Sequence, residues 1–287
     1  MNVRCRAHFP IVNGIPILIN ESSSLFSIGD FVNYRGTFFG QSSKILRFVV
    51  GLLPAIDCNI KAKTNYERFA GLLLKGNENP RVLVVGGSVV GRGMKRILST
   101  PSIECIESDV SFGPRTALIC DAHDLPFDSS SLDGVIIQAV LEHVVDPYRC
   151  VEEIHRVLRE EGLVYAETPF MQQVHGGKYD FTRFTHLGHR LLFRKFEEIS
   201  SGAVGGPGMA LAWSYRYFLL SLVKSKAARA FVGAFVRLTS FWLKYLDYYL
   251  IDRPGTLDAA SAYYFMGRKG NRILSGRELI ELYRGAV

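Results

Sequence analysis

The chain has 287 residues, a formal net charge of +7 and a pI near 9.2, and 48% of its residues are hydrophobic. This length suits one large α/β unit with appendages. The basic residues are dispersed along the chain, so the charge does not point to a nucleic-acid partner and we predict none.

Five scattered cysteines without a C-x-x-C pair exclude a disulfide framework and a zinc knuckle, and they favour a reducing cytoplasm. The apolar stretch after Arg4 and Arg6 is interrupted by Pro10, Gly14 and Pro16, so it does not read as a signal peptide. No apolar run approaches the roughly 20 residues that a membrane-spanning helix needs.

The first predicted element is a β-hairpin over residues 9–19, "FPIVNGIPILI", because Asn13-Gly14 between apolar runs suits a turn with positive φ. We assign residues 1–35 to this N-terminal module. Residues 36–79 form a linker and a leading helix at about 65–75.

An α/β unit is predicted from residue 80 to residue 287, because apolar runs alternate there with turns and helices, as in a parallel sheet. The expected strands cover 81–86, 103–107, 116–120, 134–139 and 163–168. The clearest helix is "DPYRCVEEIHRVLREEG": Asp146 caps it and Pro147 starts it. Its expected buried stripe is Tyr148, Val151, Ile154 and Leu158, with Gly162 just beyond its end.

Residues 206–258 are aromatic and basic, and they predict a helical insertion before the last strand, "SAYYFMGRK". Ser275 and Glu278 predict a capping box for a short final helix.

The glycine-rich turn in "VLVVGGSVVGRGM", residues 82–94, lets a ligand approach the backbone closely. A phosphate-binding P-loop is disfavoured because Arg92 and Gly93 replace its Lys and hydroxyl residues. A dinucleotide fingerprint is defective because Ser88 replaces a glycine. A tight strand-to-helix turn without a ligand is the remaining alternative.

The following elements favour a nucleoside ligand, since Asp109 ends the next strand where a carboxylate can accept both ribose hydroxyls. "DAHDLPF", "LDGVIIQAVLEHV" and "HRVLREEGLVYAETP" then come in order. In these motifs the chain resembles the class I S-adenosylmethionine-dependent methyltransferases of the type 11 group, over about residues 80–205. The resemblance implies a Rossmann-like, doubly wound, seven-stranded sheet.

The resemblance also implies S-adenosylmethionine as the cofactor. The glycine turn would lie under its methionine part, Asp109 would hold the ribose, Asp121 and its neighbours would meet the adenine, and Gln138 would lie near the sulfonium. The implied cofactor-binding residues are Gly86, Gly87, Ser88, Gly91, Asp109, Asp121, Ala122, His123 and Gln138. Two departures stand out: the glycine loop is one residue longer than usual, and "SFGPRT" stands where the family has a helix between its second and third strands.

The expected function is methyl transfer to a small-molecule or lipid- or sugar-linked acceptor that the sequence does not identify. Two other functions remain open: a non-catalytic cofactor-binding protein on the same fold, and a nicotinamide-dependent oxidoreductase, which would want a complete G-x-G-x-x-G.

The stretch after the fifth strand, "ETPFMQQVHGGKYDFTRFTHLGH", is expected to face the acceptor, and related methyltransferases have similar "YD-x-x-R-F-T" stretches. A hydroxyl nucleophile needs a base, and His175 is the first candidate and His143 the second. Tyr179, Asp180 and Arg183 complete the acceptor-side set. Asp180 and Arg183 have a structural alternative, as an i, i+3 pair that fixes the loop.

Metal sites are not predicted. Glu142-His143 matches part of the E-x-x-E-H site of some quinone O-methyltransferases, but Ala139 replaces the first Glu. The N-terminal "CRAHFPIVNGIPILIN" resembles a zinc-ribbon-like module known as a tRNA-methyltransferase activator. Because Cys5 and His8 alone remain near the ligand positions, we expect the hairpin to be kept and the metal lost.

Residues 226–250, taken as one helix, place aromatic and basic side chains on opposite faces. The aromatic face comprises Phe231, Phe235, Leu238, Trp242, Tyr245 and Tyr249, and the basic face Lys226, Arg229, Arg237 and Lys244. Two interpretations follow: the aromatic face packs on the core as a lid, or the segment rests on an anionic membrane surface or receives a lipid-linked acceptor. The expected location is accordingly the cytoplasm, with a peripheral position at the inner membrane face under the second interpretation.

Overall fold

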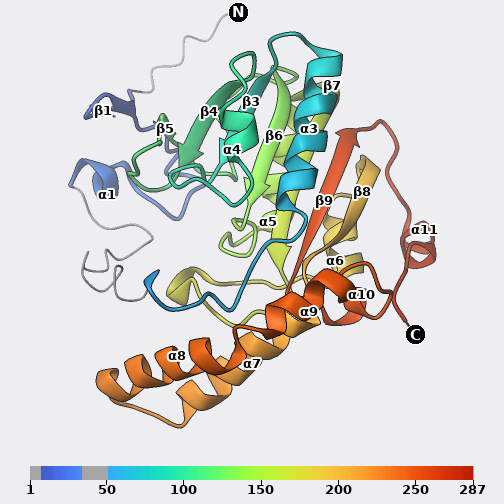
Figure 1. The fold of residues 1–287 in the computed structure, drawn as a ribbon. Helices are drawn as coiled ribbons and strands as arrows, with labels where there is room; N and C mark the ends of the chain where they lie inside the picture. The colour runs from blue at the N-terminus through green and yellow to red at the C-terminus, as the bar shows by residue number, and fades with distance from the viewer. Residues whose placement is uncertain (1–7, 34–50, 287) are drawn as a thin grey trace, which may run out of the picture.

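A computed structural model describes residues 8–33 and 51–286. Seven strands form one sheet in the order β5-β4-β3-β6-β7-β9-β8 (Figure 1). Strands β3 to β8 run parallel, and β9 is antiparallel to both of its neighbours. The strands are β3 (Arg81–Val85), β4 (Glu104–Asp109), β5 (Leu118–Ile119), β6 (Leu132–Gln138), β7 (Leu158–Pro169), β8 (Phe196–Gly205) and β9 (Ala262–Lys269).

Helices cover both faces of this sheet (Figure 1). Successive residues of β3 explain why: Leu83 joins the apolar cluster that includes α5 (Pro147–Val157) and α6 (His186–Leu192), whereas Val82 and Val84 join the cluster formed with α3 (Ala62–Gly76) and α4 (Lys95–Leu98). A strand buried on both faces reads as a continuous apolar run, as "VLVV" does. The predicted doubly wound α/β fold is confirmed.

Helix α5 begins as predicted and ends earlier. The Asp146 side chain accepts a hydrogen bond from the Arg149 N–H, and Pro147 occupies the first turn. The helix stops at Val157, and Leu158 starts β7 instead of completing the buried stripe. Tyr148 is 51% exposed, so its predicted burial is wrong. The helical period predicts which residues share a face of a helix, but it does not predict that the first residue of that face is exposed to solvent.

The N-terminal hairpin forms as predicted, with β1 (Ile11–Val12) paired to β2 (Ile15–Pro16). Asn13 and Gly14 have φ values of 50° and 79°, which suit their residue types. The hairpin docks on the sheet edge, where Ile17 bridges Ile119 of β5. The short helix α1 (Ile28–Val32) follows. Cys5, the remaining cysteine of the zinc-ribbon resemblance, lies outside the described residues.

Residues 110–117, between β4 and β5, contain no helix, as the short "SFGPRT" predicts. The N-terminal module covers the edge strand β5 instead, where Ile17, Ile19 and Phe31 are buried with Ile119.

The predicted insertion lies between β8 and β9 and projects away from the sheet (Figure 1). It consists of α7 (Pro207–Ser221), α8 (Lys226–Ser240), α9 (Leu243–Leu250) and α10 (Thr256–Ala259). The final helix α11 (Gly276–Glu281) starts with the predicted Ser275–Glu278 capping box.

Residues 226–250 are two helices and not one. Thr239 donates its hydroxyl to the Phe235 carbonyl at 2.8 Å, and Ser240 donates to the Val236 carbonyl at 2.7 Å. Two consecutive side chains that bond back to the preceding turn bend or end a helix.

The aromatic face of α8 and α9 points outward, so packing of this face on the core as a lid is wrong. Its six predicted residues are between 42% and 72% exposed. Two residues of the predicted basic face turn inward: Lys244 Nζ donates to the Ala55 carbonyl, and Arg237 is partly buried. None of the helices in the described ranges combines the length and apolar character of a membrane span.

Candidate active site

A first cavity of about 270 Å³ opens at the carboxyl ends of β3, β4 and β6. Clefts at this edge are where open parallel sheets bind ligands. The structure brings together here most of the residues predicted to bind a cofactor, and two predicted for the acceptor side. These are Gly86, Ser88, Gly91, Asp109, Asp121, Ala122, His123, His143 and Tyr179.

The glycine turn brings backbone close to the first cavity. Gly86 follows the last residue of β3 with φ +75°, and a Cβ there would collide with the Val140 side chain. Gly87 does not line the cavity; its N–H donates to the Ser108 carbonyl at 2.9 Å, and a Cβ would lie 2.9 Å from Glu107 Cβ. Both glycines are therefore required by packing, and Gly86 leaves the wall of the cavity free of a side chain at this point.

Asp109 ends β4 and points into the first cavity. Its carboxylate accepts hydrogen bonds from the Ser88 N–H at 3.1 Å and the Ser111 hydroxyl at 2.7 Å. An ionised carboxylate has about four acceptor sites, so two of them remain for a vicinal diol. This orientation fits the ribose of a nucleoside cofactor.

Asp121 is buried at the cavity's far wall, where it accepts from the His123 N–H at 3.0 Å, from His123 Nδ1 at 2.6 Å and from the Ser24 hydroxyl. Burial opposes its ionisation, but the hydrogen bonds from His123 and Ser24 outweigh it and hold the pKa of Asp121 below its ordinary value. A fixed carboxylate beside the methyl group of Ala122 suits an adenine, which has a polar edge and apolar faces.

The N-terminal module closes the same cavity, which sequence reasoning missed. Leu25 and Phe26 line it, and Asn20 Nδ2 donates to Asp124 Oδ2 at 2.6 Å, holding the segment in place. Residues 22–65 carry no periodicity, so no signal in the sequence tied them to the site.

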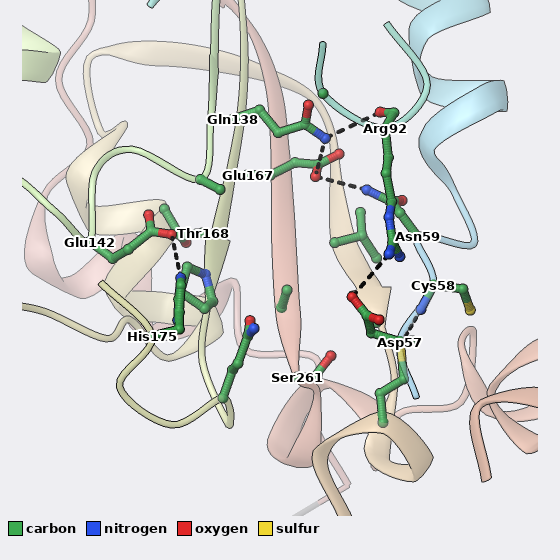
Figure 2. Close-up of a pocket in the computed structure, with 18 of the residues that line it drawn as sticks. Asp57, Cys58, Asn59, Arg92, Gln138, Glu142, Glu167, Thr168, His175 and Ser261 are labelled. Atoms are coloured by element: carbon green, nitrogen blue, oxygen red, sulfur yellow. Dashed lines mark hydrogen bonds and ion pairs between the residues drawn. The ribbon is translucent and has the colours of Figure 1, made fainter. Parts of the chain in front are cut away.

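A second cavity of about 370 Å³ lies beside the first (Figure 2). The ends of β6, β7 and β8, the base of α7 and residues 57–59 form its wall. The polar and aromatic residues that line it are Asp57, Asn59, Arg92, Gln138, Glu142, Glu167, Thr168, Gln172, His175, Trp213 and Ser261.

Glu167 is a buried carboxyl group in this second cavity. It accepts from the Tyr165 hydroxyl and, at 2.8 Å each, from Gln138 Nε2 and Asn59 Nδ2. Burial raises its pKa, although these three donors oppose the shift. Gln138 thus points toward Glu167 and lines the second cavity, not the first, where its predicted position near the sulfonium would place it. A Glu that ends a buried parallel strand, in "YAETP", was the signal available for Glu167 in the sequence.

Arg92 and Asp57 form an ion pair of 3.1 Å on the side of the second cavity away from Glu142 and His175 (Figure 2). Both side chains are about half exposed, so the pair contributes little to stability. It supplies the cavity with a cation and an anion that sequence reasoning did not assign to the site.

The two cavities share three residues, Val90, Gly91 and Ala139. Ala139 follows β6 with φ 55°, a left-handed conformation, and its N–H donates to the Glu167 carbonyl at 2.9 Å. A Cβ on Gly91 would collide with Gln138 Oε1. Small residues therefore separate the two cavities, and groups bound in each can come close at this wall.

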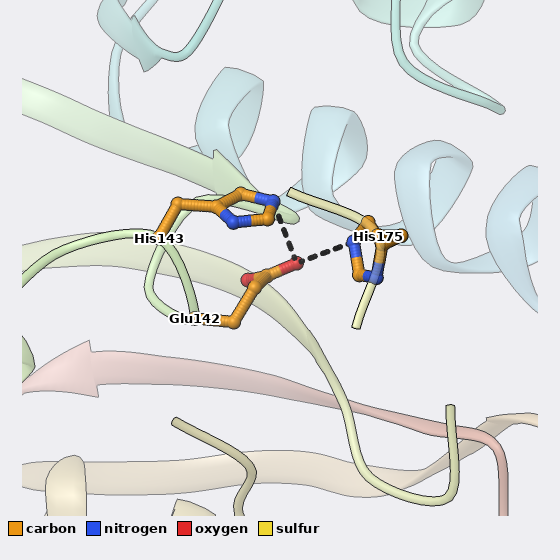
Figure 3. A group of neighbouring side chains, drawn as sticks. All are labelled: Glu142, His143 and His175. Carbon is orange, nitrogen blue, oxygen red and sulfur yellow. Dashed lines mark ion pairs between the residues drawn. The ribbon is translucent and has the colours of Figure 1, made fainter. Parts of the chain in front are cut away.

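Glu142, His143 and His175 lie together next to this wall (Figure 3). Glu142 Oε1 is 3.7 Å from the Nε2 atom of each histidine. The Glu142 carboxylate holds the pKa of His175 above its ordinary value, because an anion favours the imidazolium more strongly than partial burial disfavours it. His175 lines the second cavity and His143 the first.

Asp180 and Arg183 fix the loop that carries His175. Asp180 accepts from the backbone N–H groups of His175 and Gly176 at 2.8 and 3.0 Å and from the Arg183 guanidinium. Burial opposes ionisation, but Arg183 and the two amides hold the pKa of Asp180 well below its ordinary value. Arg183 also donates to the Gln172 carbonyl at 2.8 Å. The geometry places this pair in a positioning role.

Comparison with known proteins supports the same fold and family. The sequence from 98 to 166 matches the model of a family described as a methyltransferase domain. No curated protein matches the sequence. In the strand order, an antiparallel strand is inserted next to the edge of an otherwise parallel seven-stranded sheet. Residues 98–166 belong to a methyltransferase domain. The cofactor that this domain implies is S-adenosylmethionine.

Solved structures similar to this methyltransferase include a protein assigned as a sarcosine dimethylglycine methyltransferase from Galdieria sulphuraria, at 12% identity and a TM-score of 0.49, covering 85% of this chain and 98% of that one. A complex between the Haloferax volcanii Trm112 methyltransferase activator and a protein assigned as a methyltransferase matches at 20% identity and a TM-score of 0.45. The match covers 74% of this chain and 94% of that one. Haemonchus contortus phosphoethanolamine N-methyltransferase 2 matches at 15% identity and a TM-score of 0.43. The match covers 71% of this chain and 53% of that one.

The family match ends at Ala166, before the loop of His175 and before the insertion. The part of the methyltransferase domain that the family defines thus contains Asp109, Asp121 and Glu142. The second cavity owes His175, Trp213 and Ser261 to segments beyond the match.

Proposed function

We propose that S-adenosylmethionine binds in the first cavity and that its methyl group is transferred to an acceptor in the second. Asp109 would accept the ribose hydroxyls, the loop at Asp121 would hold the adenine, and the glycine turn would pass under the methionine part. The observation that carries the proposal is the wall shared by the two cavities at Val90, Gly91 and Ala139.

The bound cofactor supplies a methyl group on a positively charged sulfur. In the transfer, the acceptor atom forms a bond to this methyl carbon as the carbon–sulfur bond breaks, and the bonding pair stays on sulfur. The chain has to hold the two groups in line, and the small residues of the shared wall leave room for that approach. An acceptor hydroxyl also loses its proton, which calls for a base or another means of deprotonation.

The group that handles this proton is, in our proposal, Glu142 with His143 and His175. These three lie next to the shared wall, and Glu142 and His175 reach the second cavity. Tyr179 contributes its carbonyl, which lies 2.8 Å from His143 Nδ1 and fixes that ring. Asp180 and Arg183 act indirectly, by holding the loop.

The lining of the second cavity favours a polar acceptor with several hydroxyl groups, such as a sugar. Glu167, Arg92 and Asp57 offer charged partners for hydroxyls, and Trp213 offers an aromatic face. A wholly apolar acceptor would offer no hydrogen-bond partner to this polar lining.

We further propose that this sugar is carried by a lipid and that the insertion rests on an anionic membrane surface. The exposed aromatic face of α8 and α9 is accompanied by exposed Lys224, Lys226 and Arg229 at the tip of the α7–α8 hairpin. No acidic residue occurs from Ile199 to Leu246. Aromatic rings beside cations suit the boundary between headgroups and acyl chains. A location at the cytoplasmic face of a membrane follows from this proposal.

The enzymatic proposal is tested with methyl-labelled S-adenosylmethionine and cell extract separated into lipid and aqueous fractions. We expect label in the lipid fraction. The His175→Ala variant should transfer at least about 100-fold more slowly while binding the cofactor normally. The His155→Ala variant is the matched control, because His155 contacts the Gly270 carbonyl away from both cavities.

Label in the aqueous fraction would retain the methyltransferase and reject the lipid carrier. Cofactor binding without transfer to any fraction would favour the non-catalytic binding protein, and affinity for a nicotinamide dinucleotide in its place would favour the oxidoreductase.

The membrane proposal is tested by co-sedimentation with vesicles that contain anionic lipid. We expect binding at low salt that weakens as salt rises, and weaker binding of the Lys226→Glu/Arg229→Glu double variant. Equal sedimentation with neutral vesicles, or none with anionic ones, would contradict it. A salt-independent dimer in solution would assign the aromatic face to a second copy of the chain.

A further inference from the structure

The carboxyl group of Glu142 is fully buried and has no hydrogen-bond partner within the described residues. The backbone of this residue is well held, since its carbonyl accepts from the Phe181 and Thr182 N–H groups. A buried carboxylate without a partner is costly, at about 1 to 3 kcal/mol or more. Native structures therefore pair such groups, and this one faces two histidines.

Both histidines are oriented by backbone carbonyls. His143 Nδ1 lies 2.8 Å from the Tyr179 carbonyl, and His175 Nδ1 lies 3.2 Å from the Gln173 carbonyl. A carbonyl accepts only, so in the tautomer in which each Nδ1 donates to its carbonyl, each neutral ring presents the lone pair of Nε2. For His175 the carbonyl, at 3.2 Å, is nearer to Nδ1 than the Arg183 Nη2 atom at 3.5 Å. Both Nε2 atoms lie 3.7 Å from Glu142 Oε1 (Figure 3).

Three electron-pair donors facing one point repel one another unless a cation lies between them. A proton on His175 would supply a cation, but at 3.7 Å the imidazolium would meet Glu142 by charge alone, since this distance exceeds the length of a hydrogen bond. A metal ion fits better: ligand atoms about 2.1 Å from a tetrahedral Zn²⁺ are roughly 3.4 Å apart. All three ligand atoms here lie within 4.8 Å of one another.

We propose that Glu142 Oε1, His143 Nε2 and His175 Nε2 bind a divalent transition-metal ion of the Zn²⁺ type. Two imidazoles and one carboxylate form a known ligand set for such ions, with positions left open for a further ligand. Histidine ligands whose second nitrogen donates to a backbone carbonyl are also typical of metal sites.

The loop of His175 is built to reach this position. A Cβ on Gly176 would lie 2.5 Å from the His143 ring, so glycine permits the close approach of the loop. Asp180 and Arg183 hold the loop there through their bonds to its backbone. The sequence left Glu142-His143 one ligand short at Ala139, and the fold supplies the third ligand from 32 positions further along the chain.

An ion at this site would adjoin the second cavity, since Glu142 and His175 both line it. A divalent ion lowers the pKa of a hydroxyl group that binds to it. It would thereby replace a histidine base in preparing an acceptor hydroxyl. This use rests on the proposed function, whereas the binding of the ion does not.

The test is metal binding by the full chain after removal of metals with a chelator. Zn²⁺ is titrated by calorimetry, and Co²⁺ by its visible absorption. We expect one ion per chain, and an affinity that falls at least about 100-fold in Glu142→Gln and in His175→Ala. The His175→Cys variant should keep a shifted Co²⁺ spectrum, because a thiolate is also a ligand. His155→Ala is the control and should bind as the wild type does.

Unfolding temperature and cofactor affinity are measured for each variant, so that loss of metal binding is not a loss of folding. No bound ion in the wild type, or equal affinity in wild type and Glu142→Gln, would overturn the metal site. If methyl transfer persists in the metal-free protein, the proposed function stands without the ion. A failure to bind S-adenosylmethionine would reject the proposed function while leaving metal binding to be judged by its own titration.

Discussion

The sheet and the helical insertion use their apolar residues in opposite ways. In the core around the sheet, large side chains such as Phe193, at the end of α6, and Phe265 of β9 are buried and stack with ring centroids 4.7 Å apart. In α8, Phe231 and Phe235 also stack, at 6.4 Å, yet Phe231 is 72% exposed. The same residue type therefore packs in the core in one region and is exposed on the surface in the other.

The insertion also buries polar and charged side chains while it exposes aromatic ones. Asp247 of α9 is fully buried and accepts from the Gly208 and Met209 N–H groups at 2.7 and 2.9 Å, which caps the start of α7. Lys244 also points inward. Asp247 thus holds α9 against α7 within the insertion, while Ile251 packs with Ala203 and Tyr263 at its base, and the aromatic rings are left outward. The hydrophobic effect within the chain does not account for that orientation, and a contact outside the chain would.

The strongest test of this contrast is truncation of a buried ring. We expect Phe193→Ala to lower the free energy of unfolding by about 3 to 5 kcal/mol, because it removes a fully buried ring and leaves a cavity. Denaturant unfolding measures it. A loss under 1 kcal/mol would mean that the sheet is not packed as described.

Acid should weaken the sheet through the same buried layer. Burial lowers the pKa of His189 to about 3, from an ordinary 6.5. Below pH 6.5 the unfolded chain takes up a proton that the native site refuses, so this stability is complete above pH 6.5 and is lost as pH falls toward 3. Between pH 6.5 and 4.5 the loss is roughly 2 to 3 kcal/mol.

The measurement is urea unfolding of wild type and His189→Leu over this pH range. The variant cannot take up that proton in either state, so its stability should fall less steeply with acid. Parallel pH profiles for the two proteins would show that His189 is not the group responsible.

Substitution of Asp109 tests the proposed cofactor site at the carboxyl ends of the strands. Asp109→Ala should weaken S-adenosylmethionine binding by about 1 to 3 kcal/mol, because two ribose hydroxyls would lose their acceptor. Calorimetry measures it, with Asp128→Ala, an exposed carboxylate outside the lining of both cavities, as control. Wild-type affinity in Asp109→Ala would remove this residue from the cofactor site.

The smallest effect is expected in the insertion. Phe231→Ala should change the free energy of unfolding by less than about 0.5 kcal/mol, because the ring is mostly exposed. The same variant should sediment less with anionic vesicles. A large loss of stability would mean that the aromatic face is covered within the folded chain.

Local signals in the sequence carried much of the fold. Asn13-Gly14, the Asp146-Pro147 helix start and the Ser275–Glu278 capping box each depend on residues a few positions apart, and each formed as predicted. The glycine turn and Asp109 were found for the same reason, since strand ends in a parallel sheet meet at one edge.

The errors arose where distant residues decide the outcome. The same 100° period describes a face turned inward or outward, so the sequence left both interpretations of the aromatic face open, and only the structure excludes the lid. Glu142 and His175 are far apart in the sequence and become neighbours through the loop that Asp180 holds. Residues 57–59 and Leu25 entered the site from segments without any pattern.

Helix α7 also sets the distance between the second cavity and the tip of the insertion. Met209, in its first turn, lines the second cavity, and Phe218, nine residues later, is exposed near the tip of the hairpin. At about 1.5 Å per residue, the two are roughly 14 Å apart along the axis. With the tip at a lipid surface, α7 would hold the second cavity at a constant height above it. The acceptor's head group would then have to extend about that far from the bilayer, so the helix would select its substrates by reach.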